Sequence, residues 1–339
     1  MSGNIVTVFS SISGIAQSLG DSNPSLPLNV LSDPALDGYG GTVEFDPSRL
    51  QQETKASLAA AEILITEPFV LAKLLEQNPS SLSKLRWCQS TYAGVDPIFN
   101  AKISLPRDWI LTRFAGCFGP PIAEWALANM IAHERSFSAS ARDQKLKAWA
   151  GSASVLSYRY LSSLSVAILG CGDIGMCVAR AAKSFGMTTR GYGRTERGAV
   201  DGIDYYTTKL EEALCGADYI VSVLPSTPET RGLLNGDALK ACSAKPVVLL
   251  NAGRGDLISE ESVIKALDQR YIAAAYLDVF EVEPLPVESK LWEREDVVIS
   301  PHVSALTQPS DVPAVFIDNY ERFIEGRELK YVVDWSKGY

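Results

Sequence analysis

The sequence has few histidines, and its cysteines lack the spacing of metal ligands. His133 and His302 are the only histidines among 339 residues, so proton transfer near neutral pH would most naturally use one of them. The six cysteines are scattered, with no Cys-x-x-Cys pair and no Cys/His ligand spacing. We therefore predict no metal site, and we expect the cysteines to be reduced thiols in the core.

Long apolar runs and basic clusters are also missing. No run approaches the roughly 18 apolar residues that span a bilayer, and no basic residue precedes the apolar stretch near the start, as a secretory signal would require. The net charge of -9 argues against nucleic acid as a partner. We expect a cytoplasmic protein that binds neither membrane nor nucleic acid and whose ligands are small molecules or other proteins.

The chain does contain a regular alternation of strand-like and helical stretches. The strand candidates are IVTVF, LNVL, ILIT, LRWCQST and ILT in the first part, and VAIL, TTRGYG, YIVSVLP, VVLLN, IAAAYLDV and VVISP from Val166 onward. This rhythm predicts two α/β lobes with parallel sheets. A buried helix from Pro121 to about Arg135 is expected to join them. A terminal helix with Val312 and Phe316 on its apolar face should end near Gly326.

A glycine-rich turn lies between a strand candidate and a helix, in the segment Gly170-Cys171-Gly172-Asp173-Ile174-Gly175. The first glycine permits the bend, Gly172 lets the backbone approach a pyrophosphate, and Gly175 lets helix and strand pack closely. The helix N-terminus would then face the phosphates. The segment predicts dinucleotide binding, and a purely structural glycine turn is the alternative.

The end of the next strand favours NADP(H) over NAD(H). An NAD site usually has an Asp or Glu there to bind the ribose hydroxyls, but this sequence reads Tyr192-Gly193-Arg194-Thr195. Arg194 and Thr195, with Arg197 as a further candidate, could hydrogen-bond a 2′-phosphate. The alternative is a solvated arginine beside a site that binds NAD(H) without the acidic residue.

Three predicted strand ends should converge on one crevice, because ligands bind at the carboxyl ends of parallel strands. These ends carry Arg254 after VVLL, Glu283 after IAAAY, and His302 after VVIS. An arginine can bind both the carboxylate and the carbonyl oxygen of a 2-oxo acid, and a carboxylate can orient a protonated histidine. We predict a hydride-transfer site in which His302, rather than His133, handles the proton. Taken singly, Arg254 could instead be an ion-pair partner and Glu283 a solvated loop acid.

The chain resembles the D-isomer-specific 2-hydroxyacid dehydrogenase family, and within it the NADPH-dependent glyoxylate/hydroxypyruvate reductases. The resemblance rests on LRWCQSTYAGVD, FGPPIAEWALA, LGCGDIG, VLPSTPETRGLLN, NAGRGDLI, LDVFEVEPLP and SPHVSA, in the family's order and spacing. It implies that Arg254 binds and polarises the substrate, that Glu283 pairs with His302, and that His302 donates the proton. The resemblance also implies a binding set: Tyr92, Ala93 and Gly94 for the substrate, and Gly170, Gly172, Asp173, Ile174, Gly175, Gly193, Arg194, Thr195, Leu224, Pro225, Thr230, Ala252, Gly253, Asp278, His302 and Ser304 for the cofactor.

The same resemblance implies a domain layout and an oligomeric state. Residues 1–115 and 306–339 would form the substrate-binding domain, and residues 116–305 an inserted dinucleotide-binding Rossmann domain, with both sheets doubly wound and a cleft between the domains. A homodimer is expected through residues 136–163, an arm to which Trp149 would belong.

Three other readings are open at this point. A formate dehydrogenase is disfavoured, since those relatives typically have glutamine where this chain has Glu283. A short-form phosphoglycerate dehydrogenase shares the same core. A dinucleotide-sensing, corepressor-like binding protein would keep the same Arg/Glu/His set, but the absent acidic residue and the lack of long flanking disordered segments argue against it.

Overall fold

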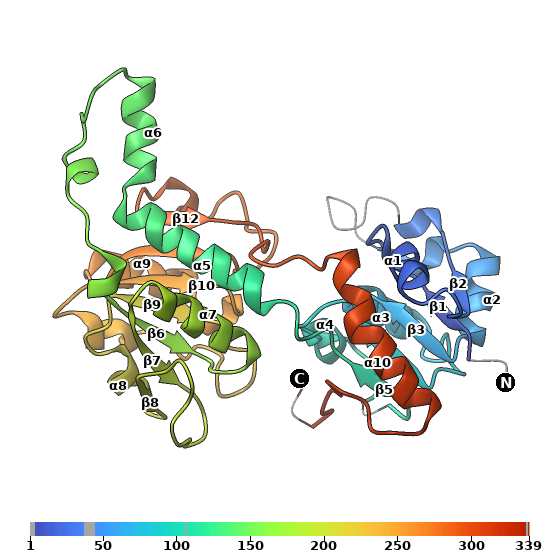
Figure 1. Cartoon of the computed structure of the whole chain (residues 1–339). Helices are drawn as coiled ribbons and strands as arrows, with labels where there is room; N and C mark the ends of the chain where they lie inside the picture. Colours follow the sequence, from blue (N-terminus) through green and yellow to red (C-terminus); the bar gives the residue numbers. More distant parts are fainter. Residues whose placement is uncertain (1–3, 37–44, 106, 337, 339) are drawn as a thin grey trace. The chain divides into compact units, whose positions relative to one another are not determined.

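The computed structural model describes residues 4–36, 45–105, 107–336 and 338. The chain divides into two compact units, one formed by Met1–Cys117 with Leu306–Tyr339 and the other by Phe118–Ala305. Each unit is built on one parallel sheet (Figure 1). The predicted class, two doubly wound parallel α/β units, is confirmed. The predicted cleft between them stays a prediction.

The first unit contains a five-stranded sheet in the order β2-β1-β3-β4-β5. Its strands are β1 Val6–Val8, β2 Leu28–Val30, β3 Ile63–Thr66, β4 Trp87–Ser90 and β5 Ile110–Thr112, and its helices are α1 Ile15–Ser22, α2 Gln52–Ala60, α3 Pro68–Gln77, α4 Asp96–Asn100 and α10 Val312–Ile324. The terminal helix α10 was predicted with its apolar face. Phe316 of this helix stacks on Trp87 of β4 with ring centroids 5.0 Å apart, so the last helix returns to complete the first core.

The second unit contains a seven-stranded sheet in the order β12-β11-β10-β9-β6-β7-β8. Its strands are β6 Ser165–Leu169, β7 Thr188–Tyr192, β8 Tyr205–Thr207, β9 Tyr219–Ser222, β10 Val247–Asn251, β11 Ile272–Leu277 and β12 Val297–Ile299, and its helices are α5 Gly119–Glu134, α6 Phe137–Lys145, α7 Asp173–Ser184, α8 Leu210–Leu214 and α9 Glu260–Asp268. The edge strand β8 was not predicted. The order reverses between β6 and β9, which makes a switch point at their carboxyl ends.

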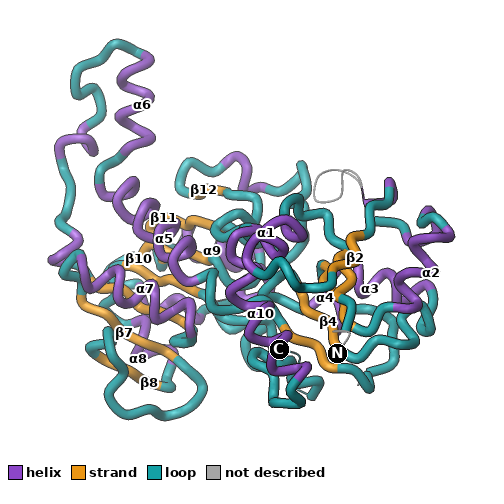
Figure 2. Tube along the Cα trace, turned by 45° about the vertical axis from the view of Figure 1, so that its right-hand side comes forward, coloured by secondary structure: helices purple, strands orange, loops and turns teal. Residues whose placement is uncertain are grey.

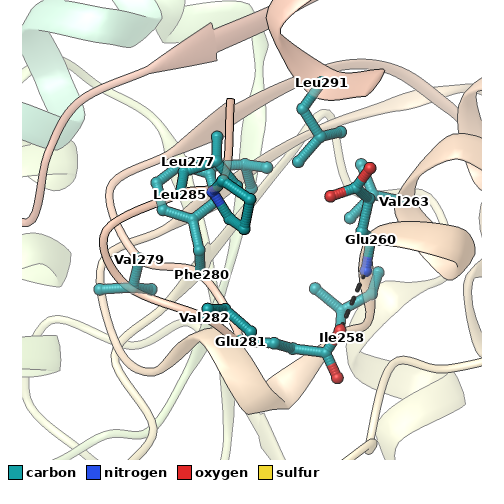
Figure 3. A pocket seen from close by; sticks show the side chains of 11 residues that line it. Ile258, Glu260, Val263, Leu277, Val279, Phe280, Glu281, Val282, Leu285 and Leu291 are labelled. Carbon is teal, nitrogen blue, oxygen red and sulfur yellow. Dashed lines mark hydrogen bonds between the residues drawn. The ribbon is translucent and has the colours of Figure 1, made fainter. Parts of the chain in front are cut away.

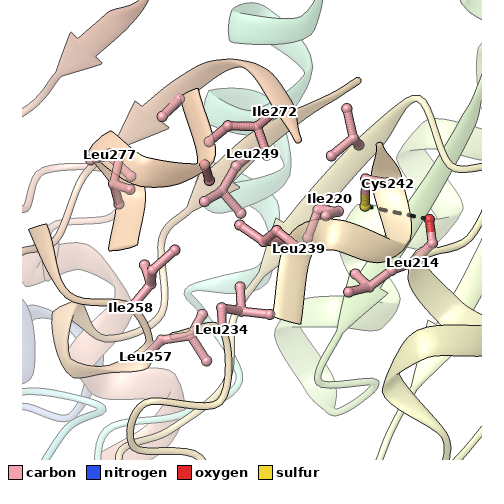
Figure 4. Close-up of a cluster of buried hydrophobic side chains, with 14 of the residues drawn as sticks. Leu214, Ile220, Leu234, Leu239, Cys242, Leu249, Leu257, Ile258, Ile272 and Leu277 are labelled. Atoms are coloured by element: carbon pink, nitrogen blue, oxygen red, sulfur yellow. Dashed lines mark hydrogen bonds between the residues drawn. The ribbon is translucent and has the colours of Figure 1, made fainter. Parts of the chain in front are cut away.

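Apolar side chains from neighbouring strands fill the interior of the second unit. Ile220, Leu249 and Leu277 come from β9, β10 and β11 and pack against Leu239 and Leu257 outside the sheet (Figure 4). Successive strands buried on both faces are typical of parallel sheets covered by helices. This core fixes the strand ends from which the functional loops leave.

A long projection leaves the second unit after α5. Helix α6 and the chain that follows it extend away from that unit's sheet (Figures 1 and 2). The base is fixed by Arg159, which pairs with Glu134 at the end of α5 and with Asp218 at the start of β9. Trp149 on the projection is 100% exposed.

Cysteine burial differs in part from the expected core placement. Cys88, Cys171 and Cys242 are buried, but Cys215 is exposed because it follows the short helix α8 in a surface turn. All six are free thiols. Within the described ranges, no helix has the length and apolar character needed to cross a membrane.

Candidate active site

The glycine-rich turn joins β6 to α7 and has the shape that a dinucleotide requires. Gly170 has a φ of +102°, a conformation that favours glycine. A Cβ on Gly175 would lie 2.0 Å from the carbonyl oxygen of Gly170, whereas a Cβ on Gly172 would meet no atom within 4 Å. Close packing is thus needed at Gly175, and open space lies beside Gly172. A pyrophosphate can approach the backbone there, next to the N-terminus of α7.

The segment after β7 is held by side-chain contacts on both sides. The hydroxyl of Tyr206 donates to the carbonyl oxygen of Thr195 at 3.0 Å. Arg197 donates from Nη1 to the carbonyl oxygen of Cys171 in the glycine-rich turn at 2.9 Å. A hydrogen bond from the Thr227 side chain lowers the pKa of Glu229, and the positive charge of Arg194 adds a smaller lowering. The segment after β7 therefore carries two cationic side chains, Arg194 and Arg197, and one of them is bonded to the glycine-rich turn.

The loop after β9 carries Leu224, Pro225 and Thr230, which were predicted to lie near the adenosine half. Thr230 folds the loop on itself, because its hydroxyl donates to the carbonyl oxygen of Pro225 at 2.5 Å and accepts from the backbone N–H of Thr227 at 2.8 Å. A Cβ on Gly253 would lie 2.7 Å from the carbonyl oxygen of Leu224. The loops after β9 and β10 are thus in close contact beside the switch point.

Arg254 follows β10 in a loop that packs directly on the loop of Glu283. Asn251 donates from Nδ2 to the carbonyl oxygen of Arg254 at 3.0 Å, and Arg254 donates from Nη1 to the carbonyl oxygen of Gly253 at 2.7 Å. A Cβ on Gly255 would lie 1.9 Å from the carbonyl carbon of Phe280. Only glycine allows this approach, which places the Arg254 loop against the chain that leads to Glu283.

Glu283 and His302 form the predicted acid–histidine pair. The Glu283 Oε2 lies 2.8 Å from the His302 Nδ1, and Oε1 accepts from the backbone N–H of Phe280 at 2.8 Å. One carboxylate oxygen is therefore fixed by the backbone while the other orients the imidazole. The side chain of His302 is 50% exposed, and because Nδ1 faces Glu283, Nε2 is the ring nitrogen that could exchange a proton with a substrate.

The buried carboxylate of Asp278 braces the loop that carries His302. It accepts from the Ser300 hydroxyl at 2.5 Å and from the backbone N–H groups of Val303 and Ser304, both at 2.9 Å. The backbone N–H of His302 donates to the Asp278 carbonyl oxygen at 2.8 Å. These bonds hold His302 at a φ of +55°, which is uncommon for a residue with a side chain. The predicted contact of Asp278 with a nicotinamide stays a prediction.

The other histidine, His133, has different surroundings. It lies on α5, with Nδ1 at 3.2 Å from the hydroxyl of Tyr276 and its ring edge-on to that of Tyr219. Burial lowers the pKa of His133, and the neighbouring Glu134 carboxylate opposes that shift. A neutral imidazole packed between two tyrosines is a structural arrangement, which leaves His302 as the better candidate for proton transfer.

A small pocket of about 100 Å³ lies behind the loop of residues 280–283 (Figure 3). Its walls are mainly apolar, with Val263, Leu277 and Leu291 among them, and the carboxylates of Glu260 and Glu281 lie on one side. Two negative charges disfavour an acid substrate, and Arg254, Glu283 and His302 do not line the pocket. It is therefore a poor candidate for the substrate site.

The predicted substrate turn, Tyr92-Ala93-Gly94, follows β4 in the first unit. Ser90 shapes it by donating from its hydroxyl to the Tyr92 carbonyl oxygen at 3.0 Å and accepting from the Tyr92 N–H at 3.1 Å. Burial, with a contribution from the charge of Glu67, raises the pKa of Tyr92. The phenol is therefore a neutral hydrogen-bond donor.

Glu67 was missed by the sequence analysis. It is 0% exposed at the end of β3, where one oxygen, Oε1, accepts from the Ser10 hydroxyl at 2.6 Å and from the Ser11 N–H at 3.0 Å. Burial raises the pKa of Glu67 despite those bonds. Its place in ILITEP, at the end of an apolar strand and before a proline, was the available signal.

Comparison with known proteins shows which family the chain resembles. Residues 127–304 match the model of the D-isomer specific 2-hydroxyacid dehydrogenase NAD binding domain. The chain is 30% identical to a glyoxylate/hydroxypyruvate reductase A from Yersinia enterocolitica over 254 residues, which is 73% of this chain and 79% of the relative.

Solved structures extend the likeness to nearly the whole chain. A D-isomer specific 2-hydroxyacid dehydrogenase family protein from Aeromonas salmonicida has a TM-score of 0.84 and 32% identity, covering 98% of this chain and 100% of that one. An NADPH-dependent glyoxylate/hydroxypyruvate reductase from Sinorhizobium meliloti, solved with NADP and sulfate, has a TM-score of 0.79 and 26% identity, covering 99% and 100%. The chain therefore belongs to the D-isomer specific 2-hydroxyacid dehydrogenase family and is an NAD(P)-dependent oxidoreductase.

Proposed function

We propose that the protein reduces a small 2-oxo acid of the glyoxylate or hydroxypyruvate type to the D-2-hydroxy acid, with NADPH as the preferred hydride donor. The observation that carries this proposal is the Glu283–His302 pair, whose Oε2 and Nδ1 atoms lie 2.8 Å apart, with the loop of Glu283 packed against that of Arg254. A cation, a proton donor and an orienting carboxylate are the groups that carbonyl reduction requires.

The proposed roles follow from the chemistry of each side chain. A bound NADPH supplies hydride to the carbonyl carbon of the substrate. The Arg254 guanidinium binds the substrate carboxylate and polarises the carbonyl oxygen. His302 donates the proton from Nε2 to that oxygen, Glu283 stabilises the imidazolium through Nδ1–H, and solvent then returns the proton to His302.

The preference for NADPH rests on the segment after β7. It has no carboxylate at residues 192–195 to repel a 2′-phosphate, and Arg194 and Thr195 can hydrogen-bond one. The open space at Gly172 supports a pyrophosphate beside it. The adenosine would be bordered by residues of the loop after β9, namely Leu224, Pro225 and Thr230. The nicotinamide half would be bordered by Ala252, Gly253, Asp278 and Ser304. The NADP complex of the Sinorhizobium relative is consistent with this preference.

Initial rates of NADPH and NADH oxidation at saturating glyoxylate, hydroxypyruvate, pyruvate and phenylpyruvate test the proposal. We expect faster turnover with NADPH and with the two- and three-carbon acids. Arg254→Ala and His302→Ala should each lower kcat/KM by at least about 100-fold while the dinucleotide Kd changes only a few-fold. Tight NADPH binding without turnover of any acid would favour a dinucleotide-sensing role instead.

We also propose a homodimer formed through the projection at residues 136–163. Its apolar side chains are unusually exposed for a monomer surface, with Leu146 at 70%, Trp149 at 100% and Leu156 at 73%. Light scattering at micromolar concentration should give twice the chain mass of 36.7 kDa. A monomer mass would contradict the dimer without affecting the proposed chemistry.

A further inference from the structure

Tyr206, on the edge strand β8, packs against the end of β7 in a close fit. A Cβ on Gly193 would lie 2.2 Å from the Tyr206 hydroxyl oxygen, and a Cβ on Gly191 would lie 3.0 Å from Cδ2 of the ring. Gly191 in β7 and Gly193 directly after it thus leave room for one aromatic ring. Its hydroxyl donates to the carbonyl oxygen of Thr195 at 3.0 Å, and burial, the largest influence, raises the pKa of Tyr206, so the phenol keeps the proton that it donates.

Two further contacts fix the same segment. The Cζ of Arg197 lies 5.9 Å from the centroid of the Tyr206 ring, and the guanidinium donates to the Cys171 carbonyl oxygen in the glycine-rich turn. The hydroxyl of Thr208, just beyond β8, donates to Glu196 at 2.7 Å. Residues 194–197 are therefore held by the edge strand β8 on one side and by the glycine-rich turn on the other.

We propose that Tyr206 is a positioning residue for NADP(H): its hydroxyl and ring hold Thr195 and Arg197 so that residues 194–195 are ordered to receive a 2′-phosphate. The inference rests on the proposed NADPH preference and adds a residue that makes no contact with the phosphate itself. In this proposal, Arg197 connects residues 194–195 to the glycine-rich turn. Preorganisation of this kind lowers the entropy lost when the phosphate binds, and NAD(H), which has no 2′-phosphate, gains little from it.

Tyr206→Phe isolates the hydroxyl while keeping the ring. Titration calorimetry with 2′,5′-ADP, which carries the phosphate, and with 5′-AMP, which does not, reads out the effect without turnover. Loss of one hydrogen bond predicts about a 3- to 10-fold weaker 2′,5′-ADP affinity, with 5′-AMP changed less than about twofold. In kinetics, KM for NADPH should rise by a similar factor, and kcat and KM for NADH should stay unchanged.

Tyr205→Phe is the matched control, because the neighbouring hydroxyl on β8 donates to Glu212 rather than to residues 194–197. It should leave both affinities unchanged. If Tyr206→Phe weakened the binding of 2′,5′-ADP and 5′-AMP equally, or weakened neither, the inference would be overturned even if the wild-type protein prefers 2′,5′-ADP. A wild-type protein that binds 2′,5′-ADP no more tightly than 5′-AMP would overturn the proposed NADPH preference, and the inference with it.

Discussion

Glu283→Gln is expected to slow catalysis by reversing the hydrogen bond that orients His302. In the wild-type protein Oε1 of Glu283 accepts from the Phe280 N–H and Oε2 faces the His302 Nδ1. A glutamine that keeps the bond to Phe280 must turn its NH₂ group toward Nδ1. Nδ1 then becomes an acceptor, and the neutral imidazole carries its proton on Nε2. The variant loses both the stabilisation of the imidazolium and the tautomer preference set by the carboxylate.

The size of the effect follows from the strength and exposure of that bond. Charge-assisted hydrogen bonds contribute roughly 1.5–3 kcal/mol, and each 1.36 kcal/mol is a factor of ten in rate. Because the two side chains are 50% and 35% exposed, solvent screening favours the lower part of this range. We therefore expect kcat/KM to fall by about 10- to 40-fold.

The assay is the initial rate of NADPH oxidation with hydroxypyruvate, together with the Kd for NADPH. The control is Glu281→Gln, two residues away, whose carboxylate accepts from the Glu260 N–H instead. The control should keep kcat/KM within about twofold, and both variants should bind NADPH normally. If Glu283→Gln also stayed within twofold of wild type, the orienting role of Glu283 would be refuted.

Three further predictions concern the glycine-rich turn, the base of the projection and the buried acid. In Gly175→Ala the added Cβ would lie 2.0 Å from a backbone oxygen, so a shifted turn should weaken NADPH binding more than about tenfold in a titration. Arg159→Met leaves the buried Glu134 carboxylate without its cation, while Asp218 keeps Lys245; urea unfolding should show a loss of about 3 kcal/mol. Because burial raises the pKa of Glu67 above its ordinary value of 4.5, the folded state holds its proton longer than the unfolded chain, and stability should fall as the pH rises above that value. Glu67→Gln should flatten this slope, and an identical slope in both proteins would contradict it.

Much of the fold could be predicted because its elements carry local patterns. The apolar run VAIL followed by three glycines gives β6 and the start of α7, and Gly326 ends the terminal helix with a φ of +69°. Strand β8 could not be predicted in the same way. It has only three residues, YYT, after a polar and glycine-containing stretch, and it exists because Arg190, Gly191 and Tyr192 offer a free strand edge for pairing.

For the site, sequence reasoning identified the functional residue types at the strand ends. It could not identify the hydrogen bonds that hold those residues in position. Arg254, Glu283 and His302 follow β10, β11 and β12, as the pattern indicated. The bracing of the His302 loop by Asp278 depends on contacts across more than 20 residues of chain. The resemblance assigned Asp278 to the cofactor, and no spacing rule indicates that its carboxylate accepts three bonds from its own protein.

The buried acid and the edge-strand tyrosine were missed for a related reason. Glu67 reads as a surface residue until Ser10 and Ser11, more than 50 positions earlier, are found to donate to it. The role of Tyr206 becomes visible only when β8 pairs with β7 and the ring meets Gly193. Both depend on contacts between distant segments, which a local pattern does not encode.

The most direct test of the account is the stereochemistry and stoichiometry of the product. Hydroxypyruvate should be incubated with a limiting amount of NADPH and the protein, and the resulting 2-hydroxy acid separated on a chiral column and quantified. The account predicts one equivalent of the D-isomer for each NADPH oxidised, and none with His302→Ala over the same time. Formation of the L-isomer, or NADPH oxidation without hydroxy acid, would contradict it.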